Sequence, residues 1–315
     1  MTITALPANQ PETFYRGAGR IAGFRATTAR PDRPEDWVGS TTSRHGLHPS
    51  GLSTLPDGRL LADAIAADPA WWLGPDRTDT GVLVKLLDAG QRLPLHVHPD
   101  RRFATQHLAS PYGKTEAWVI VEARPGAYVH LGFSRDVGAG ELSGWVAGQD
   151  IGGMLAATNR IPVYAGDAIL CPAGLPHAIG DGILLVEVQE PTDFSVLLEH
   201  EGFGLTEGHL GLGYDLALTC VDRSSWSPGR IDTLRGAAGL LPAAADPFFR
   251  ARRLRDGDHV PRGFAVAVVV GGHGRLTGEH DDRPVTRGDT LLVPYAAGPL
   301  RLQGDAEVIH LSPAA

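Results

Sequence analysis

The chain has 315 residues, 43% of them hydrophobic, which is enough to bury the core of one large domain or two ordinary ones. Its net charge of −8 and its scattered basic residues argue against a nucleic acid or an anionic membrane as a partner. There are two cysteines, Cys171 and Cys220, and no apolar run approaches about 18 residues, so we expect a cytoplasmic protein in a reducing compartment.

Strand and turn signals dominate the first two thirds of the chain. The 40 glycines and 24 prolines favour short strands joined by tight turns. Residues 1–15 are polar and contain prolines, so we expect a flexible N-terminal arm there. A helical pattern covers residues 57–69, where apolar positions recur at steps of three and four as far as Pro69. Strands are predicted at residues 81–87, 93–98, 116–122, 128–133, 159–164, 168–171 and 182–189.

The remaining third predicts a connector and a second, smaller unit. A glycine-rich stretch at residues 201–208 ends the first unit, which we place at residues 16–208. Residues 209–246 are expected to form a helical or loop connector, and residues 247–315 alternate strands and turns again. The chain as a whole predicts an all-β dominated fold of two barrels with a few short helices.

Two histidine motifs with fixed spacing lie in the first predicted unit. Residues 90–98 read Gly-x5-His-x-His and end in His96 and His98, and residues 166–177 read Gly-x5-Pro-x-Gly-x2-His and end in His177. These are the two half-motifs of a cupin, a small jelly-roll β-barrel. Because residues i and i+2 of a strand share a face, His96 and His98 should point into the barrel together.

Glu116 lies between the two motifs and completes a candidate metal site with the three histidines. Three imidazoles and one carboxylate suit Zn, Mn, Fe, Co or Ni and leave positions open for water or substrate. Any one of these histidines alone would be better interpreted as an ordinary buried or surface residue. Their joint spacing favours metal binding.

The C-terminal segment repeats part of the first unit without its histidine. Residues 284–294 match residues 161–172 in their Gly-Asp turn and in the proline five residues after the aspartate. We therefore expect a second, degenerate cupin-like barrel that supports the first and has no chemistry of its own.

These motifs resemble those of the type I phosphomannose isomerases, especially the short bacterial form. The likeness is carried by residues 82–100, 113–118 and 172–180 and covers most of the chain from about residue 15. It implies a zinc-type enzyme that interconverts an aldose and a ketose, such as mannose 6-phosphate and fructose 6-phosphate. It also implies that His98, Glu116 and His177 are metal ligands. His96 stands where the family usually has glutamine and should still coordinate.

Other positions either match or depart from the family pattern. Lys114, Glu187 and Asp193 fall on its active-site lysine and acidic positions. Leu197 stands where the family carries an arginine that faces the substrate, which leaves the substrate open. Arg44 is a candidate replacement for that charge, although a surface ion pair is the role we favour for it.

The resemblance implies an isomerisation through an enediol, which needs a base and an electrophile. We expect Glu187 or a metal-bound hydroxide to relay the proton. Lys114 would bind a sugar oxygen or a phosphate as a point charge. Asp193 could be catalytic or a turn residue. The partner would then be a small sugar or sugar phosphate.

Two other functions fit the same ligands at this stage. One is an Fe-dependent cupin dioxygenase, and the other is a non-catalytic sugar-binding or sensing protein.

Overall fold

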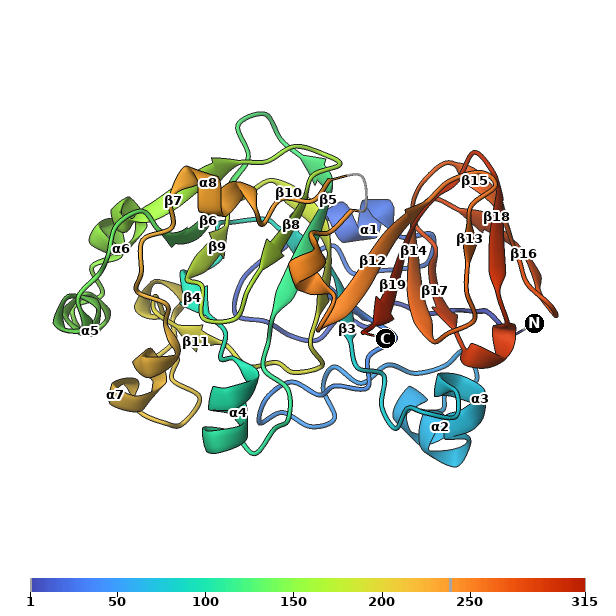
Figure 1. Cartoon of the computed structure of the whole chain (residues 1–315), viewed down its shortest axis with the longest axis horizontal. Helices are drawn as coiled ribbons and strands as arrows, with labels where there is room; N and C mark the ends of the chain where they lie inside the picture. Colours follow the sequence, from blue (N-terminus) through green and yellow to red (C-terminus); the bar gives the residue numbers. More distant parts are fainter. Residues whose placement is uncertain (1, 238–239, 315) are drawn as a thin grey trace.

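Two β-barrels lie side by side in this computed structural model, which describes residues 2–237 and 240–314 (Figure 1). Each barrel consists of two antiparallel sheets. This arrangement confirms the all-β dominated fold class that the strand and turn pattern predicted.

The first barrel contains both histidine motifs. One of its sheets has the order β2 (Glu35–Val38), β3 (Leu83–Ala89), β10 (Ile183–Gln189), β5 (Glu116–Ala123) and β8 (Ala168–Cys171). The other has the order β11 (Val196–Leu197), β4 (His96–Val97), β9 (His177–Ile179), β6 (Tyr128–Phe133) and β7 (Thr158–Pro162).

The second barrel is built from the C-terminal strands and one short N-terminal strand. Its first sheet has the order β1 (Thr4–Ala5), β17 (Thr290–Val293), β14 (Ala265–Gly271), β19 (Glu307–Pro313) and β12 (Phe249–Leu254). Its second sheet has the order β13 (His259–Val260), β18 (Leu300–Gly304), β15 (His273–Thr277) and β16 (Asp282–Thr286).

Short helices lie around the barrels and between them. The α-helices are α1 (Arg20–Phe24), α2 (Leu61–Ala67), α3 (Pro69–Leu73), α4 (Arg101–His107), α5 (Ala139–Ala147), α6 (Ile151–Ala157), α7 (Tyr214–Ala217) and α8 (Pro228–Asp232). Four 3-10 turns add η1 (Glu201–Phe203), η2 (Leu218–Cys220), η3 (Ala243–Ala245) and η4 (Tyr295–Ala297). None of the described helices has the length and apolar character needed to cross a lipid bilayer.

The largest apolar core fills the first barrel and continues into the contact between the barrels. It contains inward-facing residues of both sheets of the first barrel, and also Val266, Leu292 and Leu311 of the second. A separate cluster, which includes Val269 and Leu302, fills the second barrel. Because a continuous apolar contact excludes water along a whole sheet face, it holds the second barrel firmly against the sheet that carries Glu116.

The N-terminal residues differ from the prediction of a flexible arm, which is wrong for residues 3–6. Thr4 and Ala5 pair with Leu292 and Leu291 of β17, and Ile3 and Leu6 are buried. The reason is that β1 is short and pairs with a strand that is distant in the sequence. No local sequence pattern marks such a strand. The proposed unit boundaries at residues 208 and 246 remain predictions.

The predicted helix at residues 57–69 is also divided differently. Helix α2 ends before Asp68, whose side chain caps α3 by accepting a hydrogen bond from Trp71 N. Pro69 then occupies the first turn of α3, where its missing N–H costs nothing.

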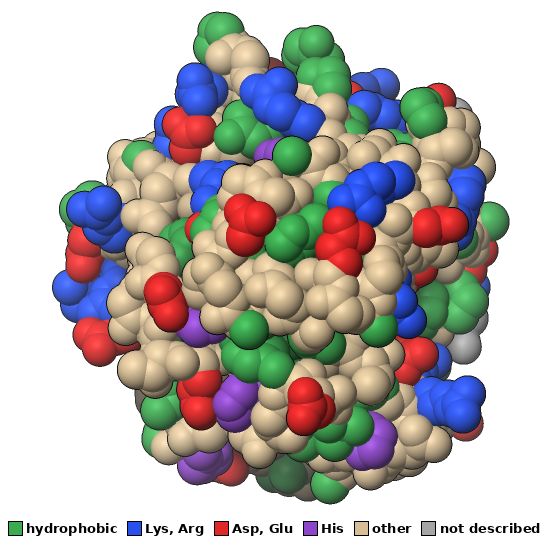
Figure 2. Space-filling model, turned by 90° about the vertical axis from the view of Figure 1, so that its left-hand side faces the viewer, with side chains coloured by type: hydrophobic (Ala, Val, Ile, Leu, Met, Phe, Trp, Pro, Cys, Tyr) green, Lys and Arg blue, Asp and Glu red, His purple; other side chains and the backbone are tan. Residues whose placement is uncertain are grey.

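Acidic and basic side chains are interspersed on the outer face of the first barrel, which Figure 2 shows. Several histidine side chains gather in the lower part of that face.

Candidate metal centre and pocket

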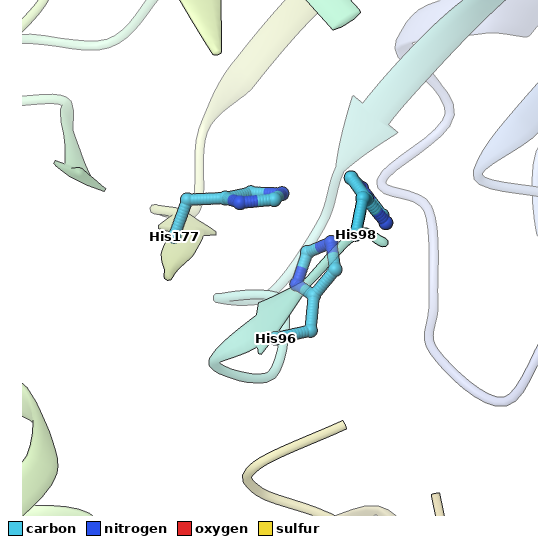
Figure 3. A group of neighbouring side chains, drawn as sticks. All are labelled: His96, His98 and His177. Atoms are coloured by element: carbon cyan, nitrogen blue, oxygen red, sulfur yellow. The ribbon is translucent and has the colours of Figure 1, made fainter. Parts of the chain in front are cut away.

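The structure brings the four predicted metal ligands together at one end of the first barrel. His96 on β4 lies opposite His177 on β9, and their ring centroids are 4.1 Å apart. The His98 ring is 4.9 Å from that of His96 and 4.8 Å from that of His177, and all three rings converge (Figure 3). Glu116 approaches from the opposite sheet, with Oε2 3.0 Å from His98 Nε2 and Oε1 3.3 Å from His177 Nε2.

Backbone carbonyls fix the proton on each of the three rings. The Nδ1 atoms lie 2.9 Å from Pro94 O for His96, 2.7 Å from Phe194 O for His98 and 2.8 Å from Leu175 O for His177. Since a carbonyl oxygen can only accept, each Nδ1 must carry the proton and donate it. Each Nε2 is then an unprotonated lone pair, which is the form that binds a metal.

The contacts of Glu116 therefore join acceptors to acceptors. Glu116 Oε2 faces the lone pair of His98, and Oε1 faces the lone pair of His177, so neither pair can share a hydrogen bond. Among the described residues, His177 Nε2 and Glu116 Oε2 have no hydrogen-bond partner. A cation between buried acceptors that face one another in this way would satisfy both of them.

The Lys114 ammonium group supplies a cation at this point in the structure. Its Nζ lies 2.9 Å from His98 Nε2 and 3.0 Å from Glu116 Oε2. The contact with His98 is a hydrogen bond to its lone pair and the contact with Glu116 is an ion pair, so Lys114 offsets part of the negative charge of the cluster. His177 Nε2 is left without a donor in the described part of the chain.

The electrostatics of the cluster favour neutral imidazoles beside an ionised carboxylate. Burial, followed by the charge of Lys114, lowers the pKa of His98 to about 3. Burial also holds the pKa of His96 well below its usual range. Burial alone would raise the pKa of Glu116, but the charge of Lys114 and the neighbouring histidines hold it well below its ordinary value. Neutral imidazole and ionised carboxylate are the protonation states of metal ligands.

This donor set fits a divalent transition metal. Three Nε2 lone pairs and one carboxylate are buried, preoriented by their carbonyl partners and unsatisfied by each other. The thiol of Cys171 lies close to Glu116 and His177 as well, within 4.8 Å between candidate ligand atoms. Burial raises the pKa of Cys171 well above its ordinary value, which favours a protonated thiol next to the cluster.

A pocket of about 410 Å³ opens from the cluster toward the surface. Its inner part is lined by His96, Lys114, Glu116 and Glu187, all buried. Its outer part is formed by more exposed residues, including His45 and Glu207. A reaction at the cluster would therefore take place in a water-poor interior that substrate reaches from one side.

Lys85 and Glu187 form a buried pair on neighbouring strands of the pocket wall. They face each other in the register of β3 and β10, and Lys85 Nζ lies 3.6 Å from Glu187 Oε1. The same Nζ lies 3.8 Å from Glu35 Oε2 and 4.6 Å from the centre of the Trp37 ring. Burial, followed by the negative charge of Glu116, raises the pKa of Glu187 to about 7.

Asp193 lies on the outer wall of the pocket beside Arg44. Its Oδ2 accepts a hydrogen bond from His45 N at 3.2 Å and lies 3.8 Å from Arg44 Nε. Arg44 thus forms the expected ion pair, but it does so on the pocket wall, with its side chain 20% exposed. Leu197 also lines the pocket, and it pairs with His96 across β11 and β4.

Sequence reasoning missed Lys85, Glu35 and Tyr15, all of which line the pocket. Tyr15 donates a hydrogen bond to Glu35, and Trp37 Nε1 donates another at 2.6 Å. Lys85 had a usable signal, since it is the one charged residue in the otherwise apolar run of residues 81–87. A lone charge in a strand buried on both faces must have a partner inside the protein.

Fold and cluster together define a double-barrel protein of the cupin type with a metal-binding arrangement of side chains. No protein-family model matches the chain. The chain is 28% identical over 278 residues to the mannose-6-phosphate isomerase of Streptococcus mutans, covering 83% of this chain and 84% of that one. These relatives support the resemblance to the type I phosphomannose isomerases that the motifs indicated.

Solved structures of mannose 6-phosphate isomerases share the fold. The Bacillus subtilis enzyme superposes with a TM-score of 0.77 over 99% of both chains, at 21% identity. A mannose 6-phosphate isomerase bound with zinc and yttrium superposes with a TM-score of 0.74 over 100% of both chains, at 14% identity. At these identities the likeness establishes the architecture of both barrels.

Proposed function

We propose that this protein is a metal-dependent sugar isomerase of the mannose-6-phosphate isomerase type, which interconverts an aldose and a ketose. The observation that carries the proposal is the cluster of three unprotonated imidazole nitrogens and one carboxylate at the inner end of a pocket. The names of the sequence relatives support the reaction class. They do not favour the dioxygenase or the non-catalytic alternative.

His96, His98, His177 and Glu116 would hold the metal. Zinc is the metal we propose, since it accepts nitrogen and oxygen ligands and a zinc-bound relative shares the fold. When bound, a divalent metal acts as a Lewis acid that polarises the sugar oxygens and stabilises negative charge that develops on them.

Glu187 is the base that we propose moves the proton between the two sugar carbons. A base works best when its pKa is close to the working pH, and the pKa of Glu187 is raised to about 7. Lys85, 3.6 Å away in the facing register, holds the carboxylate in place. Glu35 and Trp37 in turn hold Lys85, so the base rests on a rigid part of the sheet.

Lys114 would bind a sugar oxygen once a metal takes over its partners. In the present arrangement its ammonium group is held by His98 and Glu116. These two atoms would turn to the metal, and Lys114 would then be free to donate to the substrate. Asp193, which lines the pocket, would accept a hydrogen bond from a sugar hydroxyl.

The test is an isomerase assay on metal-loaded protein with its metal content measured. Mannose and fructose and their 6-phosphates should be offered in both directions, and product should form with at least one pair. The metal-depleted protein should lose this activity and regain it with added zinc. A fully loaded protein that leaves all of these sugars unchanged would contradict the proposal.

A further inference from the structure

The charged residues that line the pocket carry an excess of negative charge. Three are basic, namely Arg44, Lys85 and Lys114. The acidic residues in the lining are Glu35, Glu116, Glu187, Asp193 and Glu207. A divalent metal at the inner end would bring this pocket close to neutrality, with no surplus positive charge for an anionic substrate.

Each of the three basic side chains is also engaged with a carboxylate of the pocket. Lys85 lies within 4.0 Å of oxygens of Glu35, Glu187 and Asp193. Lys114 contacts Glu116, as described above, and Arg44 lies 3.8 Å from Asp193. Arg44 further donates a hydrogen bond to the backbone carbonyl of Glu12.

The outer end of the pocket is where a phosphate group on the substrate would have to lie. The reaction moves hydrogen between the first two carbons, which must therefore be at the metal cluster, so the last carbon points outward. Arg44 lies 3.8 Å from Asp193, and Glu207, which is 64% exposed, also lines the pocket. A phosphate dianion would meet like charge at close range, which is unfavourable.

The nearby His209 does not add a positive charge. Its Nδ1 accepts a hydrogen bond from Gly213 N at 3.2 Å, and its Nε2 lies 3.1 Å from Glu207 Oε2. Because the Gly213 N–H donates to Nδ1, that nitrogen carries no proton. The ring proton is therefore on Nε2, and His209 is in a neutral tautomer. It partners Glu207 as a hydrogen-bond donor.

Uncharged sugar hydroxyls suit this end of the pocket. Carboxylates accept hydrogen bonds from hydroxyl groups, and Arg44 can donate to a hydroxyl oxygen. Leu197 and Leu210 add apolar surface beside them, against which a sugar ring can pack. From this balance of charge we propose that the natural substrate is a neutral, unphosphorylated monosaccharide, an inference that rests on the isomerase function proposed above.

The test compares free and phosphorylated sugars on the same metal-loaded protein. We expect kcat/KM for mannose or fructose to exceed that for the 6-phosphate by at least about tenfold, and to change little between low and high salt. Equal efficiency or a preference for the 6-phosphate would overturn the inference and leave the isomerase function standing. Turnover of neither kind of sugar would instead overturn the isomerase function, and this inference with it.

Glu207→Gln tests the charge argument directly, because this side chain is 64% exposed and its removal should not disturb the fold. Removing one negative charge at the outer end should raise kcat/KM for the 6-phosphate by about two- to fivefold relative to kcat/KM for the free sugar. Glu201→Gln, an exposed acid in the same segment that does not line the pocket, is the matched control. If both variants treat the 6-phosphate as the unmodified protein does, the outer charge has no part in specificity and the argument fails.

Discussion

Replacing His177 with alanine tests how much a bound metal adds to the free energy of unfolding. In the metal-free protein the variant loses a fully buried ring, and truncating a large buried ring costs about 3–5 kcal/mol. It also removes a buried acceptor that has no hydrogen-bond partner, and this removal stabilises the protein by about 1–3 kcal/mol. We therefore expect the metal-free variant to be less stable by about 2 kcal/mol.

The larger effect of the substitution is on the stability that the protein gains when it binds metal. At a metal concentration 100 times Kd, binding stabilises the native protein by about 2.7 kcal/mol. Loss of a supporting partner of a ligand weakens metal binding by about 10- to 100-fold, so loss of a ligand should cost at least about 100-fold. At the same metal concentration the variant would gain only about 0.4 kcal/mol. For 315 residues that unfold together, the metal-dependent rise in Tm should fall from about 4 °C to less than about 1 °C.

The assay is thermal unfolding with and without zinc, combined with elemental analysis of the metal. His130→Ala is the matched control, since His130 is buried on the neighbouring strand β6 and bonds Thr158 Oγ1 at 2.7 Å outside the cluster. That control should lower Tm yet keep the full rise with zinc. A His177→Ala protein that retains stoichiometric metal and the full rise would refute the assignment of His177 as a ligand.

Three further outcomes follow from the same geometry. Glu187→Gln should lower kcat by about 10²–10⁴ with the metal content unchanged, and the rise of the wild-type rate as pH increases through about 7 should disappear, because the base works only when deprotonated. Lys114→Met should lower the Tm of the metal-free protein, because it leaves His98 and Glu116 without a cation. Added zinc should then raise the Tm of the variant by more than it raises that of the wild type. An unchanged Tm of the metal-free variant would contradict this. Burial lowers the pKa of His310 to about 4, so between pH 6.5 and 4 the unfolded chain binds a proton at His310 more readily than the folded protein does. The free energy of unfolding should therefore fall by about 2 kcal/mol between pH above 6.5 and pH 5. Urea unfolding of His310→Gln should show a smaller fall over the same range.

The strands and the cluster of the first barrel could be predicted from the sequence because their signals are local. The strand predicted at residues 128–133 and that at 168–171 have the observed bounds. His96 and His98 converge because the two-residue period of a strand fixes their common face. His177 joins them because the half-motif places it at the start of β9, directly opposite His96.

Other features depend on contacts that no local pattern marks. The strand β1 is two residues long and pairs with β17, near the opposite end of the chain. Helices α5 and α6 contain several glycines and bury few side chains, so their periodicity is weak. Arg44 reaches the pocket through a loop, and its position depends on Asp193, far along the sequence. The same holds for the carbonyl partners that fix the histidine tautomers.

X-ray absorption spectroscopy of the zinc-loaded protein tests most directly whether three imidazoles and a carboxylate surround one cation. We expect a first shell of nitrogen and oxygen atoms at about 2.0–2.2 Å, with the outer scattering of three imidazole rings. Sulfur at about 2.3 Å would instead indicate that Cys171 has entered the site, and a shell without imidazole scattering would place the metal elsewhere. Either result would contradict the metal centre on which the proposed function depends.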